Sequence, residues 1–229
     1  YSFVADHFQC LACLGVIVPV AAAGWLAAAQ FRPWSGGAVV LILATLGTLT
    51  WCQGHNYMDR ETLWRHTIEK NPGAWMAHNN LGLELQSHGK LDEAITCYLE
   101  ALRINPESPT AYNNMANALQ TQGRLDEAIS HYLQALQLAP SYGDAHYNLA
   151  NALQSRGHLD DSAGHYRQAL EVKPKFAPAH HNLAKVLAAQ GRLDEAVRTI
   201  QDHINARPDD AEAHYNLALA LMRRRRLDE

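Results

Sequence analysis

The chain has 229 residues and a formal net charge of −4, and 18% of its residues are charged. The basic residues of this net negative chain do not recur along one face, so the composition argues against nucleic-acid phosphate as a partner. The averages conceal two unlike parts, because Asp6 and Arg32 are the only Asp, Glu, Lys or Arg in residues 1–53.

Two uncharged, apolar runs occupy the first part of the chain. The run 8–31 is long enough to cross a bilayer as a helix, for which about 20 residues are needed. The second run, 34–53, carries Trp34 and Trp51 near its ends, where the amphipathic indole rings suit the membrane interfaces. We predict two transmembrane helices in contact with lipid, and hence an integral, multi-pass membrane protein. The alternative is a pair of buried helices in a soluble domain, because the alanine-rich stretches are only mildly hydrophobic.

Arg32 lies in the short loop between the two predicted spans. Basic residues in short loops favour the cytoplasm, which places the rest of the chain on the non-cytoplasmic side, periplasmic or lumenal. Residues 54–74 then connect the spans to a repeated region. In this connection Trp64 and Ile68 occupy positions that hold packed residues in the repeats, so we predict a helix packed as half a repeat.

From residue 75 onward the chain repeats a unit of 34 residues. A fixed step of this length indicates one supersecondary unit that is stacked several times. Apolar residues within each unit are spaced for two helices. A glycine between the helices permits the positive φ at which the first helix ends, and a proline prevents the second from continuing. The glycines are Gly89, Gly123, Gly157 and Gly191, and the prolines are Pro106, Pro140, Pro174 and Pro208.

The pattern Asn-Leu-Gly/Ala, Gly-x-Leu-Asp-Glu-Ala, Tyr, Ala-Leu and Pro resembles the tetratricopeptide repeat. The resemblance implies an all-α fold, a right-handed superhelix or α-solenoid. The fourth copy departs from the pattern at Ile200 and His203, and Arg225 replaces the turn glycine of the fifth. The repeat domain is expected at 75–229, with full copies at 75–108, 109–142, 143–176 and 177–210 and a partial copy at 211–229.

A second resemblance covers roughly residues 1–82. The segment from Tyr1 to Phe8, the two spans and the segment from Met76 to Gly82 are similar to transmembrane-and-tetratricopeptide O-mannosyltransferase-like proteins. This resemblance implies a GT-C type glycosyltransferase that modifies protein on the lumenal or periplasmic side. The catalytic acidic residues of that family would precede Tyr1, so we expect a fragment without catalytic residues.

One asparagine recurs in the first helix of each repeat, immediately before a packed Leu or Met, and is expected on the concave surface. A side-chain amide is both donor and acceptor, so a row of amides is suited to the backbone of an extended peptide. The row resembles the repeats of O-GlcNAc transferase, where an asparagine ladder holds protein substrates. The alternative is that these amides bond neighbouring helices. The predicted peptide-binding residues are Asn80, Asn114, Asn148, Asn182 and Asn216.

The histidine and cysteine patterns predict no metal and no cofactor. His146, His180 and His214 are one repeat apart, and packed helices are about 8–10 Å apart, whereas zinc–nitrogen bonds are about 2 Å long. We therefore expect a row of packed histidines. Cys10 and Cys13 lie inside a predicted span, away from the cations and helix N-termini that activate thiols.

Two functions are compatible with these patterns. The first is a membrane-anchored arm that binds extended polypeptide for a membrane glycosyltransferase whose catalytic part lies outside this chain. The second is a membrane-anchored scaffold that assembles partner proteins and catalyses nothing. Whether the whole protein is an enzyme depends on the sequence before Tyr1, where further spans with an acidic pair would indicate the first function. The arginine run 223–226 is interpreted as a solvated helix end.

Overall fold

The computed structural model describes residue 45 and residues 59–228. The predicted spans 8–31 and 34–53 therefore lie outside the described residues, apart from Thr45. Within the described part, no helix combines the length and the apolar character that a membrane crossing requires.

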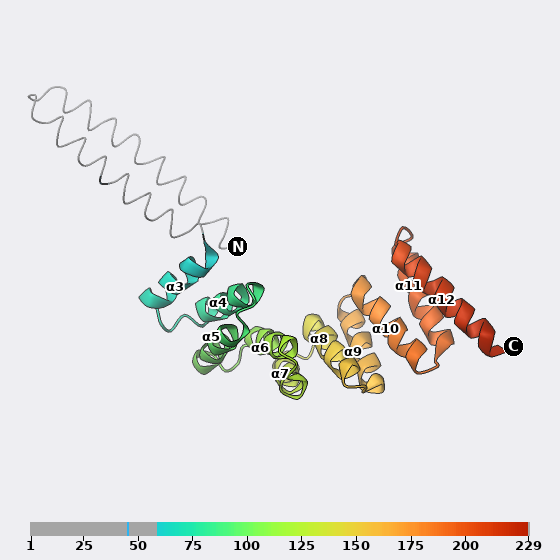
Figure 1. The fold of residues 1–229 in the computed structure, drawn as a ribbon, viewed down its shortest axis with the longest axis horizontal. Coiled ribbons are helices and arrows are strands. Elements are labelled where there is room, and N and C mark those ends of the chain that lie inside the picture. The colour runs from blue at the N-terminus through green and yellow to red at the C-terminus, as the bar shows by residue number, and fades with distance from the viewer. Residues whose placement is uncertain (1–44, 46–58, 229) are drawn as a thin grey trace, which may run out of the picture. The chain divides into compact units, whose positions relative to one another are not determined.

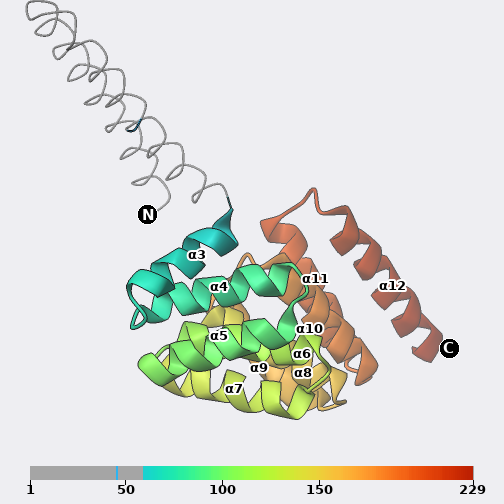
Figure 2. The same cartoon turned by 60° about the vertical axis from the view of Figure 1, so that its left-hand side comes forward.

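Residues 59–228 form ten helices and, within that range, no strand, which confirms the predicted all-α class. Figures 1 and 2 show a succession of helix pairs from α4 to α12. From α4 to α12, each helix packs mainly on the helices immediately before and after it in the chain, as expected for a solenoid. The helices are α3 (Arg60–Lys70), α4 (Trp75–Ser87), α5 (Leu91–Ile104), α6 (Pro109–Thr121), α7 (Leu125–Leu138), α8 (Gly143–Ser155), α9 (Leu159–Val172), α10 (Ala177–Ala189), α11 (Leu193–Ala206) and α12 (Ala211–Asp228).

The turn within each repeat is built by its glycine. Gly89 has a φ of 76°, and the amide of Lys90, which follows it, donates to the carbonyl of Leu85 at 2.9 Å. This i to i−5 bond is the Schellman motif, which requires a left-handed residue that glycine supplies without strain. The same positive φ recurs at the three other turn glycines, Gly123, Gly157 and Gly191.

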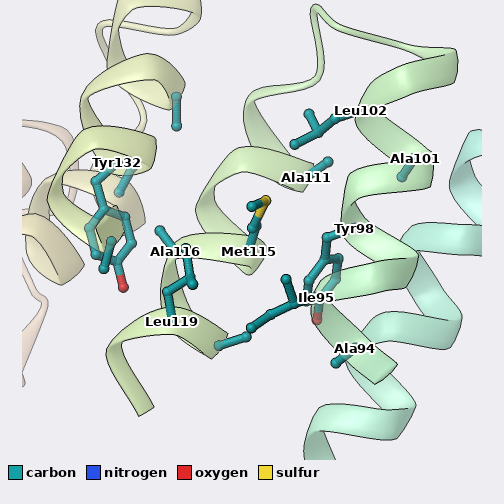
Figure 3. Close-up of a cluster of buried hydrophobic side chains, with 14 of the residues drawn as sticks. Ala94, Ile95, Tyr98, Ala101, Leu102, Ala111, Met115, Ala116, Leu119 and Tyr132 are labelled. Atoms are coloured by element: carbon teal, nitrogen blue, oxygen red, sulfur yellow. The ribbon is translucent and has the colours of Figure 1, made fainter. Parts of the chain in front are cut away.

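A tyrosine at the centre of each of the first three full repeats joins the two helices of the pair. Tyr98 is fully buried, and its hydroxyl donates to Gln86 at 2.9 Å. A Cβ added to Gly82 would lie only 2.5 Å from the Tyr98 ring, so the close approach of α4 and α5 depends on this glycine. In Figure 3, Tyr98 and Ile95 of α5 and Met115 of α6 lie in one cluster of buried side chains.

α3 is the part of the connecting segment 54–74 that forms a helix among the described residues, and its packing as half a repeat stays a prediction. Trp64 and Ile68 of α3 are partly buried and pack against the same core as the first full repeats. They take the places that Tyr98 and Leu102 hold one repeat later. α3 therefore covers the side of the first repeat that has no preceding repeat.

A polar contact between the ends of consecutive pairs recurs at every junction from the first to the fifth copy. The residue that directly follows the first helix reaches the aspartate that is the second residue of the preceding second helix, and Arg224, at the same repeat position, does so from within α12. Two junctions use a glutamine amide and two use an arginine guanidinium. The contacts are Gln122–Asp92 (2.7 Å), Arg156–Asp126 (2.7 Å), Gln190–Asp160 (2.7 Å) and Arg224–Asp194 (3.2 Å).

The fourth and fifth copies differ where the sequence departs from the pattern. Ile200 replaces the central tyrosine, and Ala188 stands where the earlier repeats have its glutamine partner, so both members of the bond are absent together. α12 continues through Arg225 to Asp228 instead of turning. An arginine has no easy access to the left-handed conformation of the turn, so the helix runs on.

Candidate functional site

The five predicted asparagines lie on α4, α6, α8, α10 and α12, one per repeat. Asn114 is buried, and the other four are partly buried. The structure does not gather these amides into one pocket, because each belongs to a different repeat. They form a row along the first helices, as the repeat spacing predicts.

The amide nitrogens of three of these residues bond the preceding repeat. Asn114 donates to Asn79 at 3.0 Å, and Asn148 donates to Asn113 at 3.1 Å. Asn79 and Asn113 occupy the same position in their repeats, one residue before the predicted row, and both are buried. These bonds satisfy the alternative expectation, in which the asparagines join neighbouring helices.

The third junction keeps this contact with different acceptors. Asn182 donates to Asn151 at 3.0 Å and to the hydroxyl of Tyr147 at 3.3 Å. Within the described residues, the side-chain oxygens of Asn148 and Asn182 accept no hydrogen bond from the protein. Bonding between repeats therefore uses the donors of the row and leaves these two acceptors for another group.

The fourth junction breaks the series. The position that should accept from Asn216 is His181, and the amide nitrogen of Asn216 is buried without a hydrogen-bond partner. A buried donor without a partner is uncommon in folded proteins. Asn216 belongs to the row by its position in the repeat, and nothing in the sequence distinguishes its amide from the others.

Asn216 lines a groove of about 200 Å³ between α10 and α12. Its wall is largely apolar and includes Ile200 of α11 and Leu219 of α12. Two cations, Lys185 of α10 and Arg223 of α12, also line it. Neither cation forms an ion pair with any residue that the structure describes. The groove thus combines an apolar wall, one unused amide donor and two positive charges.

The arginine run divides between two roles. Arg223 faces the groove, whereas Arg224 forms the junction contact with Asp194. The three arginines whose side chains are described, 223–225, are exposed, as expected for a solvated helix end.

The repeat-spaced histidines have a structural bond in common. In His78, His146, His180 and His214, Nε2 lies 2.7–3.0 Å from the carbonyl oxygen of the proline six residues earlier. The bond fixes the loop between repeats to the helix that follows it. The second repeat has Tyr112 at this position and lacks the bond.

His146 also pairs with His165. Their Nδ1 atoms are 3.1 Å apart and their rings are stacked with centroids 5.3 Å apart. Burial lowers the pKa of His165, and the neighbouring His146 lowers it further. Burial likewise lowers the pKa of His180, so these two imidazoles favour their neutral forms.

The structure brings together a cluster that repeat spacing does not predict, at the junction of α10, α11 and α12. It contains His181, His203 and Asp210. The hydrogen bond from His203, followed by the backbone amide of Ala213, lowers the pKa of Asp210 to about 2, so the carboxylate is ionised. The available sequence signal is His203, which stands where the earlier repeats have alanine.

The cysteines contribute no site to the described residues. Cys97 of α5 forms no disulfide, and it is partly buried and packs against the apolar core as a small apolar side chain. Cys10 and Cys13 lie outside the described residues.

Comparison with solved structures identifies the same fold in other proteins. The crystal structure of YrrB, a TPR protein with an unusual peptide-binding site, superposes with a TM-score of 0.62 at 24% identity, covering 71% of this chain and 84% of YrrB. The crystal structure of MamA gives a TM-score of 0.60 at 22% identity and covers 65% of this chain and 87% of MamA. At these identities the likeness concerns the fold alone.

A third structure is the first TPR of Spaghetti (RPAP3) bound to the HSP90 peptide SRMEEVD. It is 26% identical, has a TM-score of 0.50, and covers 51% of this chain and 93% of its own. No curated protein matches the chain.

Family models match along the repeated region. A TPR repeat model matches residues 82–123, and two tetratricopeptide repeat models match residues 107–173 and 155–220. These ranges overlap and together extend over the four glycine turns. The chain is therefore a tetratricopeptide-repeat protein over residues 82–220.

Proposed function

We propose that this chain is a protein-interaction arm that binds an extended, acidic polypeptide segment, and that the groove between α10 and α12 is its principal contact. The observation that carries the proposal is the buried amide nitrogen of Asn216, which has no partner and lines that groove. A backbone carbonyl is a suitable acceptor for it, since an amide donor recognises peptide backbone whatever the side chains are.

The charge of the groove supports an acidic ligand. Lys185 and Arg223 line it from opposite helices, and neither forms an ion pair with a described residue. An Asp or Glu side chain between them would gain two attractive contacts, and the pair would raise the association rate of an acidic chain. The apolar wall at Leu219 and Ile200 would cover an aliphatic side chain beside the carboxylate.

The remaining asparagines would extend the contact along the row. Asn148 and Asn182 retain side-chain oxygens that are able to accept from backbone N–H groups of the same extended segment. Their nitrogens stay engaged between repeats. The peptide-binding role predicted for Asn80, Asn114, Asn148, Asn182 and Asn216 is thus proposed with Asn216 as donor and with Asn148 and Asn182 as acceptors.

The solved relatives support this class of ligand. The YrrB structure is described by its peptide-binding site, and the RPAP3 domain holds a peptide with two glutamates and an aspartate. Both are tetratricopeptide-repeat proteins, which makes protein or peptide binding the expected use of the present repeats.

The finer role rests on the resemblance of residues 1–82 to membrane O-mannosyltransferase-like proteins. On that basis the bound polypeptide would be the acceptor of a membrane glycosyltransferase, with the repeats on the non-cytoplasmic side. A membrane-anchored scaffold that only assembles partners would bind peptide in the same way. An assay of sugar transfer by the full-length protein distinguishes the glycosyltransferase arm from the non-catalytic scaffold.

Fluorescence anisotropy with labelled peptides of equal length tests the groove. We compare an Asp/Glu-rich peptide with its Asn/Gln counterpart, using the full chain. The double variant Lys185→Glu/Arg223→Glu is expected to weaken acidic-peptide binding by about tenfold or more, which corresponds to about 1.4 kcal/mol. Asn216→Ala is expected to weaken both peptides, because its bond is to backbone.

Lys175→Glu/Arg198→Glu is the matched control, because it makes the same change in net charge at exposed positions that do not line the groove. Equal losses in the two double variants would show that only net charge matters and would contradict the proposed groove. Equal binding of the acidic and the amide peptide to the unaltered chain would contradict the acidic ligand.

A further inference from the structure

Three segments meet at the fourth junction and place histidines and carboxylates together. His181 comes from α10, His203 from α11, and Asp210 from the loop before α12. One possible ligand atom from each lies within 4.8 Å of the others. His203 is fully buried and His181 is 8% exposed.

The distances within the cluster are close to those of a metal site. Nε2 of His203 is 2.7 Å from Oδ2 of Asp210, and Nε2 of His181 is 3.8 Å from the same oxygen. In a tetrahedral zinc site with bonds near 2.0–2.1 Å, ligand atoms are about 3.3–3.5 Å apart. The two observed distances to Oδ2 of Asp210, 2.7 and 3.8 Å, lie on either side of that spacing.

Each of the three residues directs one possible metal-ligating atom at the other two. Nε2 of His181 is buried and has no hydrogen-bond partner, since 3.8 Å is too long for a hydrogen bond. Nδ1 of the same ring lies 3.5 Å from Oε1 of Glu212. Metal-binding histidines commonly direct their second nitrogen at a carboxylate, which fixes the tautomer with the lone pair toward the metal.

Asp210 divides its two oxygens between two roles. Oδ1 accepts from the backbone amide of Ala213 at 3.1 Å and caps α12. Oδ2 faces both histidines. The cap holds the carboxylate in place, so the position of Oδ2 does not depend on its contacts with the histidines.

The cluster replaces ordinary repeat residues at two positions of a single junction. His203 stands where Ala101, Ala135 and Ala169 are fully buried, and His181 stands where Asn79 and Asn113 accept the inter-repeat bond. These replacements leave buried ring nitrogens unpartnered in His181 and His203. The fourth junction therefore lacks the hydrogen bond between side-chain amides and has possible metal ligands in its place.

We propose that His181, His203 and Asp210 bind a divalent transition-metal ion of the zinc type, which joins α10, α11 and α12. Imidazole and carboxylate together suit Zn²⁺ and the neighbouring first-row ions. Two histidines and one carboxylate leave a fourth position for water or for a group from a ligand. His180 is not part of the set, because its Nε2 lies 2.9 Å from the carbonyl oxygen of Pro174.

The proposed site differs from the row of repeat-spaced histidines, which are too far apart to bind one metal ion together. His146, His180 and His214 remain one repeat apart, each bonded to a proline carbonyl. The proposed site uses two histidines from different helices of one junction.

The proposal is tested by measuring zinc binding to the full chain. Bound metal is first removed with a chelator, and zinc affinity is then measured by competition with a chromophoric chelator. The variants His203→Ala and His181→Asn introduce residues that other repeats carry at these positions, so both are expected to fold. Each should bind one zinc ion fewer than the unaltered chain, or bind it at least 100-fold more weakly. His214→Ala is the control, because that exposed histidine bonds Pro208 and lies outside the set.

Cobalt gives a second readout, since four-coordinate Co²⁺ absorbs strongly in the visible. The absorption should appear with the unaltered chain and with His214→Ala and be lost in the two ligand variants. Zinc should raise the Tm of the unaltered chain but not that of His203→Ala. Equal zinc stoichiometry and affinity in the unaltered chain and both ligand variants would overturn the proposal. If circular dichroism shows that either variant is unfolded, Asp210→Asn, which retains the helix cap, decides by the same criteria.

Discussion

Nδ2 of Asn148 donates to Oδ1 of Asn113 at 3.1 Å, 35 residues earlier in the chain. Asn113 is buried, so its oxygen depends on this donor for its hydrogen bond. The bond links α8 to α6, the first helices of two consecutive repeats. An asparagine row of this kind is therefore part of the junction between repeats, in addition to any role toward a ligand.

Removing this donor should destabilise the solenoid. Asn148→Ala leaves the Asn113 oxygen buried and unpaired, which costs about 1–3 kcal/mol. Asn216→Ala should cost far less, because its nitrogen has no partner to lose. Urea unfolding of the two variants measures the difference. Equal free energies of unfolding would contradict the structural role of the Asn148 amide.

Two glycines should respond in opposite ways to alanine. Gly123 has a φ of 79°, and Gly123→Ala should destabilise by about 1–2 kcal/mol, the cost of a left-handed conformation with a Cβ. Gly164 lies within α9 with nothing within 4 Å of an added Cβ, so Gly164→Ala should stabilise by about 0.5–1 kcal/mol. Thermal denaturation of both variants checks the signs, and two changes of the same sign would be inconsistent with this backbone geometry.

The hydroxyls of the buried tyrosines should contribute unequally to the free energy of unfolding. The hydroxyl of Tyr132 lies within hydrogen-bond distance of the side-chain oxygens of both Gln120 and Asn117, which share its single proton, whereas that of Tyr98 has Gln86 alone. Tyr132→Phe should therefore cost more than Tyr98→Phe, with each lost bond worth about 0.5–1.5 kcal/mol. The free energies of unfolding in denaturant rank the two. A larger loss for Tyr98→Phe would contradict the bonding described.

Acid should weaken the fold in two stages. The pKa of His165 and that of His180 are lowered in the folded protein, chiefly by burial. Below about pH 6.5, the usual histidine value, the unfolded chain then binds more protons than the folded one, and stability falls as the pH falls. The pKa of Asp210 is lowered from 3.8 to about 2, so its contribution is lost later, between these values.

His165→Gln isolates the first stage. Removal of one histidine with a lowered pKa should reduce the loss of stability between pH 7 and pH 5, measured by urea unfolding at each pH. His88→Gln is the comparison, because His88 is exposed and lies at the end of α4. If His165→Gln leaves this pH dependence unchanged, burial of the imidazole does not account for it.

The sequence predicts most of this fold because the repeat reports the same packing several times. The glycine turns and the buried tyrosines both follow from one 34-residue step. The predicted handedness of the superhelix and the spans in residues 1–53 stay predictions.

The candidate sites were less predictable because they depend on side-chain partners instead of positions. Asn148 and Asn216 are equivalent in sequence, yet one donates to Asn113 and the other faces a groove. Periodicity likewise directs attention to the repeated His146 and His180. It passes over His203, whose significance lies in breaking the pattern.

The junction contacts at the ends of the helix pairs alternate in chemistry, and this alternation has a consequence for the response to salt. Gln122–Asp92 and Gln190–Asp160 join an amide to a carboxylate, whereas Arg156–Asp126 and Arg224–Asp194 join two full charges at exposed positions. Screening by added electrolyte weakens the exposed ion pairs far more than the amide contacts. These four contacts are therefore alternately salt-resistant and salt-sensitive along the chain, and an increase in ionic strength weakens the second and fourth of them more than the first and third.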